Sequence, residues 1–343
     1  MYSARPTPPR GRQRLIALAA AAALTPQFSW ALTLVESPPG SQQPYVAPNV
    51  IISVDDSGSM GYRLDRSTSG GTQNITAPNP DGSWNLAAPR MNILKYALKQ
   101  VFNDTTLLPD KKIRLAWQVM WNNGGSPGVG PKKSNGSAGA TSVNSTTSGT
   151  NSMKVLDGTH RADFLSFVNS LTPGNNTPAH WMFEQADGYM RQPLGVNSPW
   201  ASVPGTTAEP YLACRRNYHI MMTDGRWNQG ESDVPDTSYR DNATNRSLPD
   251  GTVYGGIAAA DVAKSALYRD TTSKTLADWA FFSWAKPLQT TGLTGTMSAT
   301  AAYIKAPATE SFGNDSAGKP AILERFWNPR YDPATWAHMV TYT

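Results

Sequence analysis

The residues best suited to chemistry in this chain are three oxygen-bearing side chains that follow one apolar run. Val50–Val54 has the composition of a buried strand, and Asp55, Ser57 and Ser59 come directly after it in the pattern D-x-S-x-S. A carboxylate and two hydroxyls around one turn are hard oxygen ligands of the kind that Mg2+ prefers. Asp, Ser and Gly also build ordinary turns, so the pentapeptide alone leaves both interpretations open.

Two later positions offer oxygen ligands in comparable places. Thr177 precedes a predicted helix at 179–190, and Asp224 follows a predicted strand at 217–223. Because open α/β sheets bind ligands at the carboxyl ends of their strands, these side chains are candidates for one shared site. The alternatives are a helix-capping role for Thr177 and a plain Asp-Gly turn at Asp224 and Gly225.

In this order, the turn, the threonine and the second aspartate resemble the metal-ion-dependent adhesion site (MIDAS) of von Willebrand factor A domains. The resemblance implies that the metal ligands are Asp55, Ser57, Ser59, Thr177 and Asp224. It places Asp56, Gly58 and Gly225 in supporting or turn positions. The implied cofactor is Mg2+, with Mn2+ or Ca2+ as alternatives, and the implied partner is a protein that offers an acidic side chain to the cation.

Predicted strands and helices alternate around these loops. The strands are expected at 50–54, 113–121, 154–156, 217–223 and 336–342, and the helices at 91–102, 161–171, 179–190, 257–268 and 276–284. This alternation predicts an α/β fold of the von Willebrand factor A-like (Rossmann-like) type, with a mostly parallel sheet and helices on both faces. The domain is expected to cover 48–343, with insertions at about 61–89, 124–152, 229–256 and 290–328. No helix follows the last predicted strand, so the domain is expected to be incomplete at its C-terminus.

The N-terminus has the pattern of a secretory signal. Four arginines and no acidic residue occur in 1–31, where the apolar run Leu15–Leu24 is followed by Ser29 and Ala31 at the −3 and −1 positions of a cleavage site. The run is too short to span a bilayer, and no later segment reaches that length. We therefore expect an exported chain that begins, after cleavage, with an extended lead-in at 32–47.

Charge and cysteine content exclude several classes of protein. The net charge is +5, and removing the four arginines of the signal leaves +1, which gives no electrostatic basis for binding nucleic acid. Cys214 is the one cysteine, so a multi-thiolate zinc site is excluded. In an exported protein an odd cysteine indicates a free thiol, an intermolecular bond, or a partner outside this sequence.

An enzyme is the main alternative, and the sequence argues against it. The nucleophile pattern G-x-S-x-G around Ser59 fails because position 57 is serine, and no phosphate-binding G-x-x-x-x-G-K-[ST] loop occurs. His180 and His219 are conceivable bases, but we expect His219 in the core and His180 at the surface or in a capping role. A scaffold that binds no ligand through metal, and carbohydrate binding by loop tryptophans such as Trp84, Trp200 and Trp227, are further alternatives.

Whole segments of the chain resemble one family. APNVIISVDDSGSM, NNTPAHWMFEQA, CRRNYHIMMTDGRWN and TLADWAFFSWAKPL are similar to the N-terminal portion of PilC/PilY-type type IV pilus proteins. The resemblance implies a role in pilus biogenesis and surface adhesion at the pilus tip, the cell surface, or the periplasm and outer membrane. The implied partners are pilus subunits or a host or surface receptor. Members of the family usually continue into a C-terminal β-propeller, which is not present here, so the resemblance implies a fragment or a truncated product.

Overall fold

The computed structural model describes residues 45–120, 151–174, 176–225, 227–228, 232–240, 246–255, 272–314, 318 and 320–343. Several predictions lie outside these residues: the signal at 1–31, nearly all of the lead-in at 32–47, most of the insertion at 124–152, and the helix at 257–268.

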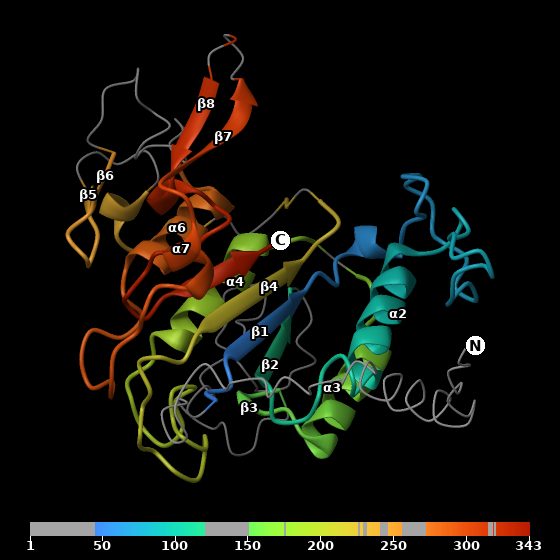
Figure 1. Ribbon diagram of the computed structural model, residues 1–343. Helices are drawn as coiled ribbons and strands as arrows, with labels where there is room; N and C mark the ends of the chain where they lie inside the picture. The colour runs from blue at the N-terminus through green and yellow to red at the C-terminus, as the bar shows by residue number, and fades with distance from the viewer. Residues whose placement is uncertain are drawn as a thin grey trace, which may run out of the picture. The chain divides into compact units, whose positions relative to one another are not determined.

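The core of the domain is a five-stranded sheet with the order β3-β2-β1-β4-β9 (Figure 1). Its strands are β1 (Asn49–Val54), β2 (Arg114–Val119), β3 (Lys154–Val155), β4 (Asn217–Met222) and β9 (Met339–Tyr342). β1 pairs in parallel with β2 and β4, β4 pairs in parallel with β9, and β3 is antiparallel to β2. The predicted α/β fold with a mostly parallel sheet is therefore confirmed.

The central strand β1 is apolar along most of its length because it is covered on both faces. Val50, Ile52 and Val54 pack into one hydrophobic cluster with side chains of α2 (Arg90–Asn103) and α3 (Gly158–Ser170). Ile51 points the other way, into a second cluster. Side chains alternate between the faces of a strand, so a strand buried on both faces needs apolar residues at consecutive positions.

Helices cover the two faces of the sheet, as predicted. α2 and α3 lie on the face of the first cluster, while α4 (Ala179–Met190) and α6 (Leu276–Ala285) pack in the second (Figure 1). The predicted bounds differ most at α3, which begins three residues early. Its N-cap is Asp157, whose carboxylate accepts a hydrogen bond from the backbone N–H of His160 and so stabilises an extra first turn.

Two expectations about the C-terminal part change. Residues 290–328, to which the sequence assigned no elements, hold α7 (Ala301–Lys305), the hairpin of β7 (Thr309–Asn314) with β8 (Pro320–Glu324), and the short 3-10 helix η5 (Arg325–Trp327). The last strand was predicted to begin at 336 but begins at Met339. His338 Nδ1 is instead hydrogen-bonded to the carbonyl of Trp336 at 2.7 Å, which keeps these residues out of the ladder. Shorter elements outside the sheet are η1 (Gly58–Gly61), η3 (Thr237–Tyr239), β5 (Arg246–Ser247) and β6 (Val253–Tyr254).

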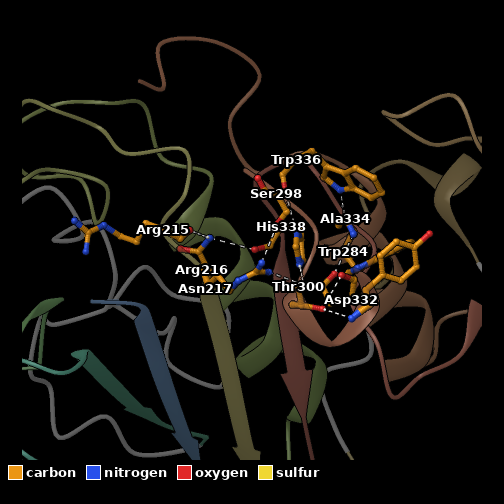
Figure 2. A network of polar contacts seen from close by, with 11 residues as sticks. Arg215, Arg216, Asn217, Trp284, Ser298, Thr300, Asp332, Ala334, Trp336 and His338 are labelled. Carbon is orange, nitrogen blue, oxygen red and sulfur yellow. Dashed lines mark hydrogen bonds and ion pairs between the residues drawn. The ribbon is translucent and has the colours of Figure 1, made fainter. Parts of the chain in front are cut away.

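A polar network joins the amino ends of β4 and β9 (Figure 2). The carboxylate of Asp332 lies 2.9 Å from Arg216 Nη1 and 3.0 Å from His338 Nε2, and its backbone carbonyl accepts from the Thr300 hydroxyl. Burial raises the pKa of Asp332, but its interactions with His338, with the backbone N–H of Ala334 and with Arg216 together outweigh burial and bring the pKa below its ordinary value. This network fastens the edge strand at the end of the sheet opposite to the D-x-S-x-S turn.

A second polar row crosses the middle of the sheet. Gln118 donates to Ser53 Oγ at 2.6 Å and to the carbonyl of Met182 at 2.8 Å, and Ser53 Oγ lies 2.7 Å from His219 Nε2. His219 is fully buried, as predicted, and burial lowers its pKa to about 3.

Among the described residues, no helix has the length and apolarity needed to cross a membrane.

Candidate metal centre

Parallel pairing brings the two predicted aspartate loops to one edge of the sheet. Val54 and Met222 are paired residues at the carboxyl ends of β1 and β4, and the N–H of Asp55 donates to the carbonyl of Met222 at 2.8 Å. Asp55 and Asp224 therefore leave neighbouring strands at the same edge, although 169 positions separate them in the chain. This is where an open parallel sheet places its ligand sites.

Asp55 is fully buried, and both of its carboxylate oxygens accept hydrogen bonds. Oδ1 accepts from the backbone N–H of Ser57 at 2.8 Å, and Oδ2 accepts from the hydroxyl of Thr223 at 2.8 Å. The first bond closes the turn locally. The second joins the turn to the end of β4, and sequence reasoning missed Thr223 because nothing in its local pattern separates it from the rest of the strand.

The two serine hydroxyls extend from Asp55 toward Asp224. Ser57 Oγ lies 3.0 Å from Ser59 Oγ, and Ser59 Oγ donates to Asp224 Oδ1 at 2.9 Å. Because the proton of Ser59 is used on Asp224, Ser57 is the donor in the first contact. Ser57 is the N-cap residue of η1, yet its side chain makes no capping hydrogen bond, so its hydroxyl is available for this row.

Arg90 completes the row and was not anticipated from the sequence. Its Nη1 donates to Asp224 Oδ2 at 2.6 Å, and the two side chains are 23% and 10% exposed. Arg90 is the first residue of α2, which follows the insertion at 61–89. The contact spans 134 positions in sequence, so no local motif indicates it.

Thr177 lies buried beside the Asp224 loop, in the segment before α4. Its N–H donates to Asn228 Oδ1 at 2.9 Å, and the N–H of Asn228 donates back to the Thr177 carbonyl at 3.3 Å. Thr177 is not the N-cap residue that the capping interpretation makes it, because the N-cap of α4 is Pro178, which makes no side-chain capping hydrogen bond. The reciprocal bonds tie the Thr177 loop to the loop that carries Asp224.

The three supporting positions lie in the turns. Asp56 is buried, and its carbonyl accepts from the N–H of Gly174 at 2.8 Å; Gly58 is the first residue of η1. Gly225 has a φ of +145°, which favours glycine, and its N–H approaches the Thr223 hydroxyl at 3.3 Å.

The oxygen spacing fits a small divalent cation. Oxygens that occupy adjacent corners of an octahedron at ~2.1 Å from Mg2+ are about 3 Å apart. The Ser57–Ser59 and Ser59–Asp224 oxygen distances of 3.0 and 2.9 Å agree with that spacing. Among the described residues no group of three or more His, Cys, Asp or Glu side chains could hold a metal, so hydroxyls have to supply part of any ligand set.

His180 and His219, the two histidines considered as catalytic bases, lie in different elements of the fold. His219 lies in the polar row in mid-strand, as predicted. His180 was expected at the surface or as a cap, but it is fully buried, with its ring 5.2 Å from that of Trp227. Trp200 is also buried, with its Nε1 bonded to the Met190 carbonyl at 2.8 Å, so it is not available for a carbohydrate-binding surface.

An open, mostly parallel sheet covered by helices, with a D-x-S-x-S turn and an aspartate loop at its carboxyl edge, defines the von Willebrand factor A-like class of α/β domain. Comparison with known sequences gives a closer relationship, to the type IV pilus biogenesis factor PilY1 of Pseudomonas aeruginosa. The chain is 38% identical over 193 residues to PilY1 of strain PAK, which covers 56% of this chain and 14% of the relative. It is 34% identical over 230 residues to PilY1 of strain PAO1, covering 67% and 16%.

A third PilY1, from strain UCBPP-PA14, is 28% identical over 201 residues, which is 59% of this chain and 14% of the relative. The aligned part of the chain belongs to the PilY1 family, and the chain spans about one seventh of the length of the relatives that it matches. No family model matches the chain, and no solved structure matches it.

Proposed function

We propose that this domain is a cation-dependent binding module that serves type IV pilus biogenesis and surface adhesion. The observation that carries the proposal is the row of oxygens from Ser57 through Ser59 to Asp224, spaced at 3.0 and 2.9 Å. Asp55, Ser57, Ser59, Thr177 and Asp224 would hold the cation. When bound, the cation supplies a positive charge with an exchangeable position that a partner's carboxylate can take.

The chain's own residues make the site suited to this role. Hydroxyl ligands carry no charge, so Ser57, Ser59 and Thr177 add coordination without neutralising the cation further. The backbone N–H of Ser57 and the hydroxyl of Thr223 hold the carboxylate of Asp55 in one orientation, so little freedom is lost when a ligand binds. Mg2+, Mn2+ and Ca2+ all take oxygen ligands of this kind, so each is a candidate for the site.

The pilus role rests on the relatives. Three similar proteins are named as type IV pilus biogenesis factors, and the chain aligns with about one seventh of each. We therefore place the module at the pilus or the cell surface, where its partner is a pilus subunit or a surface receptor with an exposed acidic side chain. The signal pattern at 1–31 supports export.

The experiment is a titration of the purified domain with Mg2+ and Mn2+, followed by calorimetry. Ser59→Ala removes one hydroxyl from the row, and Asp55→Ala removes a carboxylate; we expect cation affinity to fall at least about tenfold in the first and to be lost in the second. Asp81→Ala is the matched control, because Asp81 lies in an exposed turn of the 61–89 insertion and bonds to Ser83.

Circular dichroism shows whether each variant is folded. If folded Asp55→Ala binds the cations as tightly as the parent protein, the metal site is ruled out and the oxygen row is a structural hydrogen-bond network. In cells that make the protein, Ser59→Ala should reduce surface attachment while pilus number is kept. Loss of pili together with attachment would instead assign the module to pilus assembly.

A further inference from the structure

Arg90 is an unusual residue for the place that it occupies. It is the first residue of α2, and a helix N-terminus carries a partial positive charge that disfavours cations. No acidic residue lies in the first turn of α2 to offset it. The compensation comes from a distant segment, through the 2.6 Å contact with Asp224.

This contact uses the carboxylate that the proposed cation needs. Asp224 Oδ1 receives the Ser59 hydroxyl and Oδ2 receives Arg90. A divalent cation held by Ser59 and Asp224 would lie within a few ångströms of the guanidinium, where two positive charges repel strongly because both groups are mostly shielded from water. The arginine and the cation are therefore competitors for one charge.

The structure gives Arg90 room to leave. A groove of about 490 Å³ lies next to the ion pair, and both Arg90 and Asp224 line it. Its other walls include the apolar side chains of Met60, Leu64 and Ile93. The long stem of an arginine can lie along such an apolar wall while its guanidinium stays in water.

We propose that Arg90 acts as a built-in counter-ion of Asp224 and is displaced from it when a cation binds, so that competition with Arg90 sets the cation affinity. This inference rests on the proposed function. Arg90 is a positioning residue: it neutralises Asp224 while the site has no cation, and it weakens binding of the cation by remaining available to return. Arg90 acts through its positive charge. A lysine at position 90 should therefore keep part of its effect on cation affinity, and a glutamine should keep none.

The test is the Mn2+ affinity of the purified domain, measured by calorimetry and by the spin-resonance signal of free Mn2+. We expect Arg90→Gln to bind Mn2+ roughly tenfold more tightly than the parent protein, and Arg90→Lys to stay within about threefold of it. Arg63→Gln is the matched control: Arg63 is the second residue after η1, its guanidinium pairs with Asp65 at 2.8 Å, and its side chain is 37% exposed. It should leave the affinity unchanged.

Thermal melting gives a second readout. Without cation, Arg90→Gln should melt below the parent protein because Asp224 loses its partner, and saturating Mn2+ should close that gap. Unchanged or weaker Mn2+ binding by folded Arg90→Gln, with normal binding by the parent protein, would overturn the inference and leave the proposed function standing. Absence of Mn2+ binding in the parent protein and in every variant would overturn both.

Discussion

At the scale of single residues, Asp55 and His219 show how the hydrogen-bond partners of a buried polar group decide what it can do. Asp55 is fully buried yet keeps two donors, and His219 is fully buried with one short contact to Ser53. A buried imidazole without a nearby acid is stabilised in its neutral form. The hydrogen bonds of Asp55 hold its carboxylate in one orientation in the loop, whereas His219 packs in the core.

His219 leads to a prediction about acid stability. Its folded-state pKa of about 3 lies below the ordinary value of 6.5, so the unfolded chain takes up a proton that the folded protein does not. The stability that depends on neutral His219 is fully present above about pH 6.5 and falls by roughly 1.4 kcal/mol for each pH unit between there and pH 3. Replacing His219 by glutamine should remove this loss.

The measurement is urea unfolding at pH 7 and at pH 5. Between these two pH values the free energy of unfolding of the parent protein should fall by about 2 kcal/mol more than that of His219→Gln. The glutamine can still bond to Ser53, so the variant is expected to fold, with a moderate loss at pH 7. If the free energy of unfolding falls equally in both proteins, groups other than His219 control the loss of stability in acid.

Part of the candidate site can be predicted from local sequence, and part depends on contacts between distant segments. Asp55, Ser57 and Ser59 are spaced to meet within one turn, so their cluster could be predicted from five residues. Thr223 and Arg90 contribute through contacts made across the sheet, and their local surroundings carry no signal of this. Their roles depend on which strands are neighbours, and the order β1 next to β4 is a property of the fold rather than of any motif.

At the scale of elements, helices and strands were predictable where apolar periodicity was strong. β1, α2 and α4 bury regular apolar faces, and their bounds match the predicted ones within one residue. The α7 helix and the β7–β8 hairpin were missed because their burial is slight: α7 has no buried residue, and β7 is mostly exposed. Elements that do not bury an apolar face leave a weak periodic pattern.

The contact between α4 and α6 allows a prediction at this scale. Arg191, at the end of α4, pairs with Asp187 at 2.7 Å and donates to the carbonyls of Lys286 and Pro287 at the end of α6. The guanidinium therefore donates hydrogen bonds to carbonyl groups at the C-terminal end of α6, where carbonyls have no partner within the helix. Removing it also takes the cationic partner from the carboxylate of Asp187, whose side chain is 4% exposed and which keeps its 2.6 Å hydrogen bond from the Ser283 hydroxyl.

Arg191→Ala should accordingly lower the free energy of unfolding by about 2–4 kcal/mol, measured by chemical denaturation. The comparison variant is Arg330→Ala, whose side chain is 64% exposed and lies 3.6 Å from Glu310. Exposed ion pairs contribute little, so this variant should change stability by less than about 1 kcal/mol. Similar losses in the two variants would contradict the role of Arg191.

At the scale of the whole sheet, the two polar sites lie at opposite ends of the same strand. The Asp332 network fastens the amino ends of β4 and β9, while the oxygen row lies beyond the carboxyl ends of β1 and β4. β4 has six residues, so the two sites are separated by roughly 20 Å. Sites that are farther apart than about 10 Å and share no partner usually contribute additively to stability.

This separation predicts that stability and cation binding can be changed one at a time. Asp332→Asn removes the charge that pairs with Arg216 and His338 and should destabilise the domain by about 1–3 kcal/mol. Mg2+ at about 100 times its dissociation constant should then add ~2.7 kcal/mol to the variant and to the parent protein alike, because binding to the folded state alone stabilises it by that amount. Asp55→Ala should show no such gain. Urea unfolding of the three proteins with and without Mg2+ measures both effects, and a Mg2+ gain that disappears in Asp332→Asn would show that the two ends of the sheet are coupled.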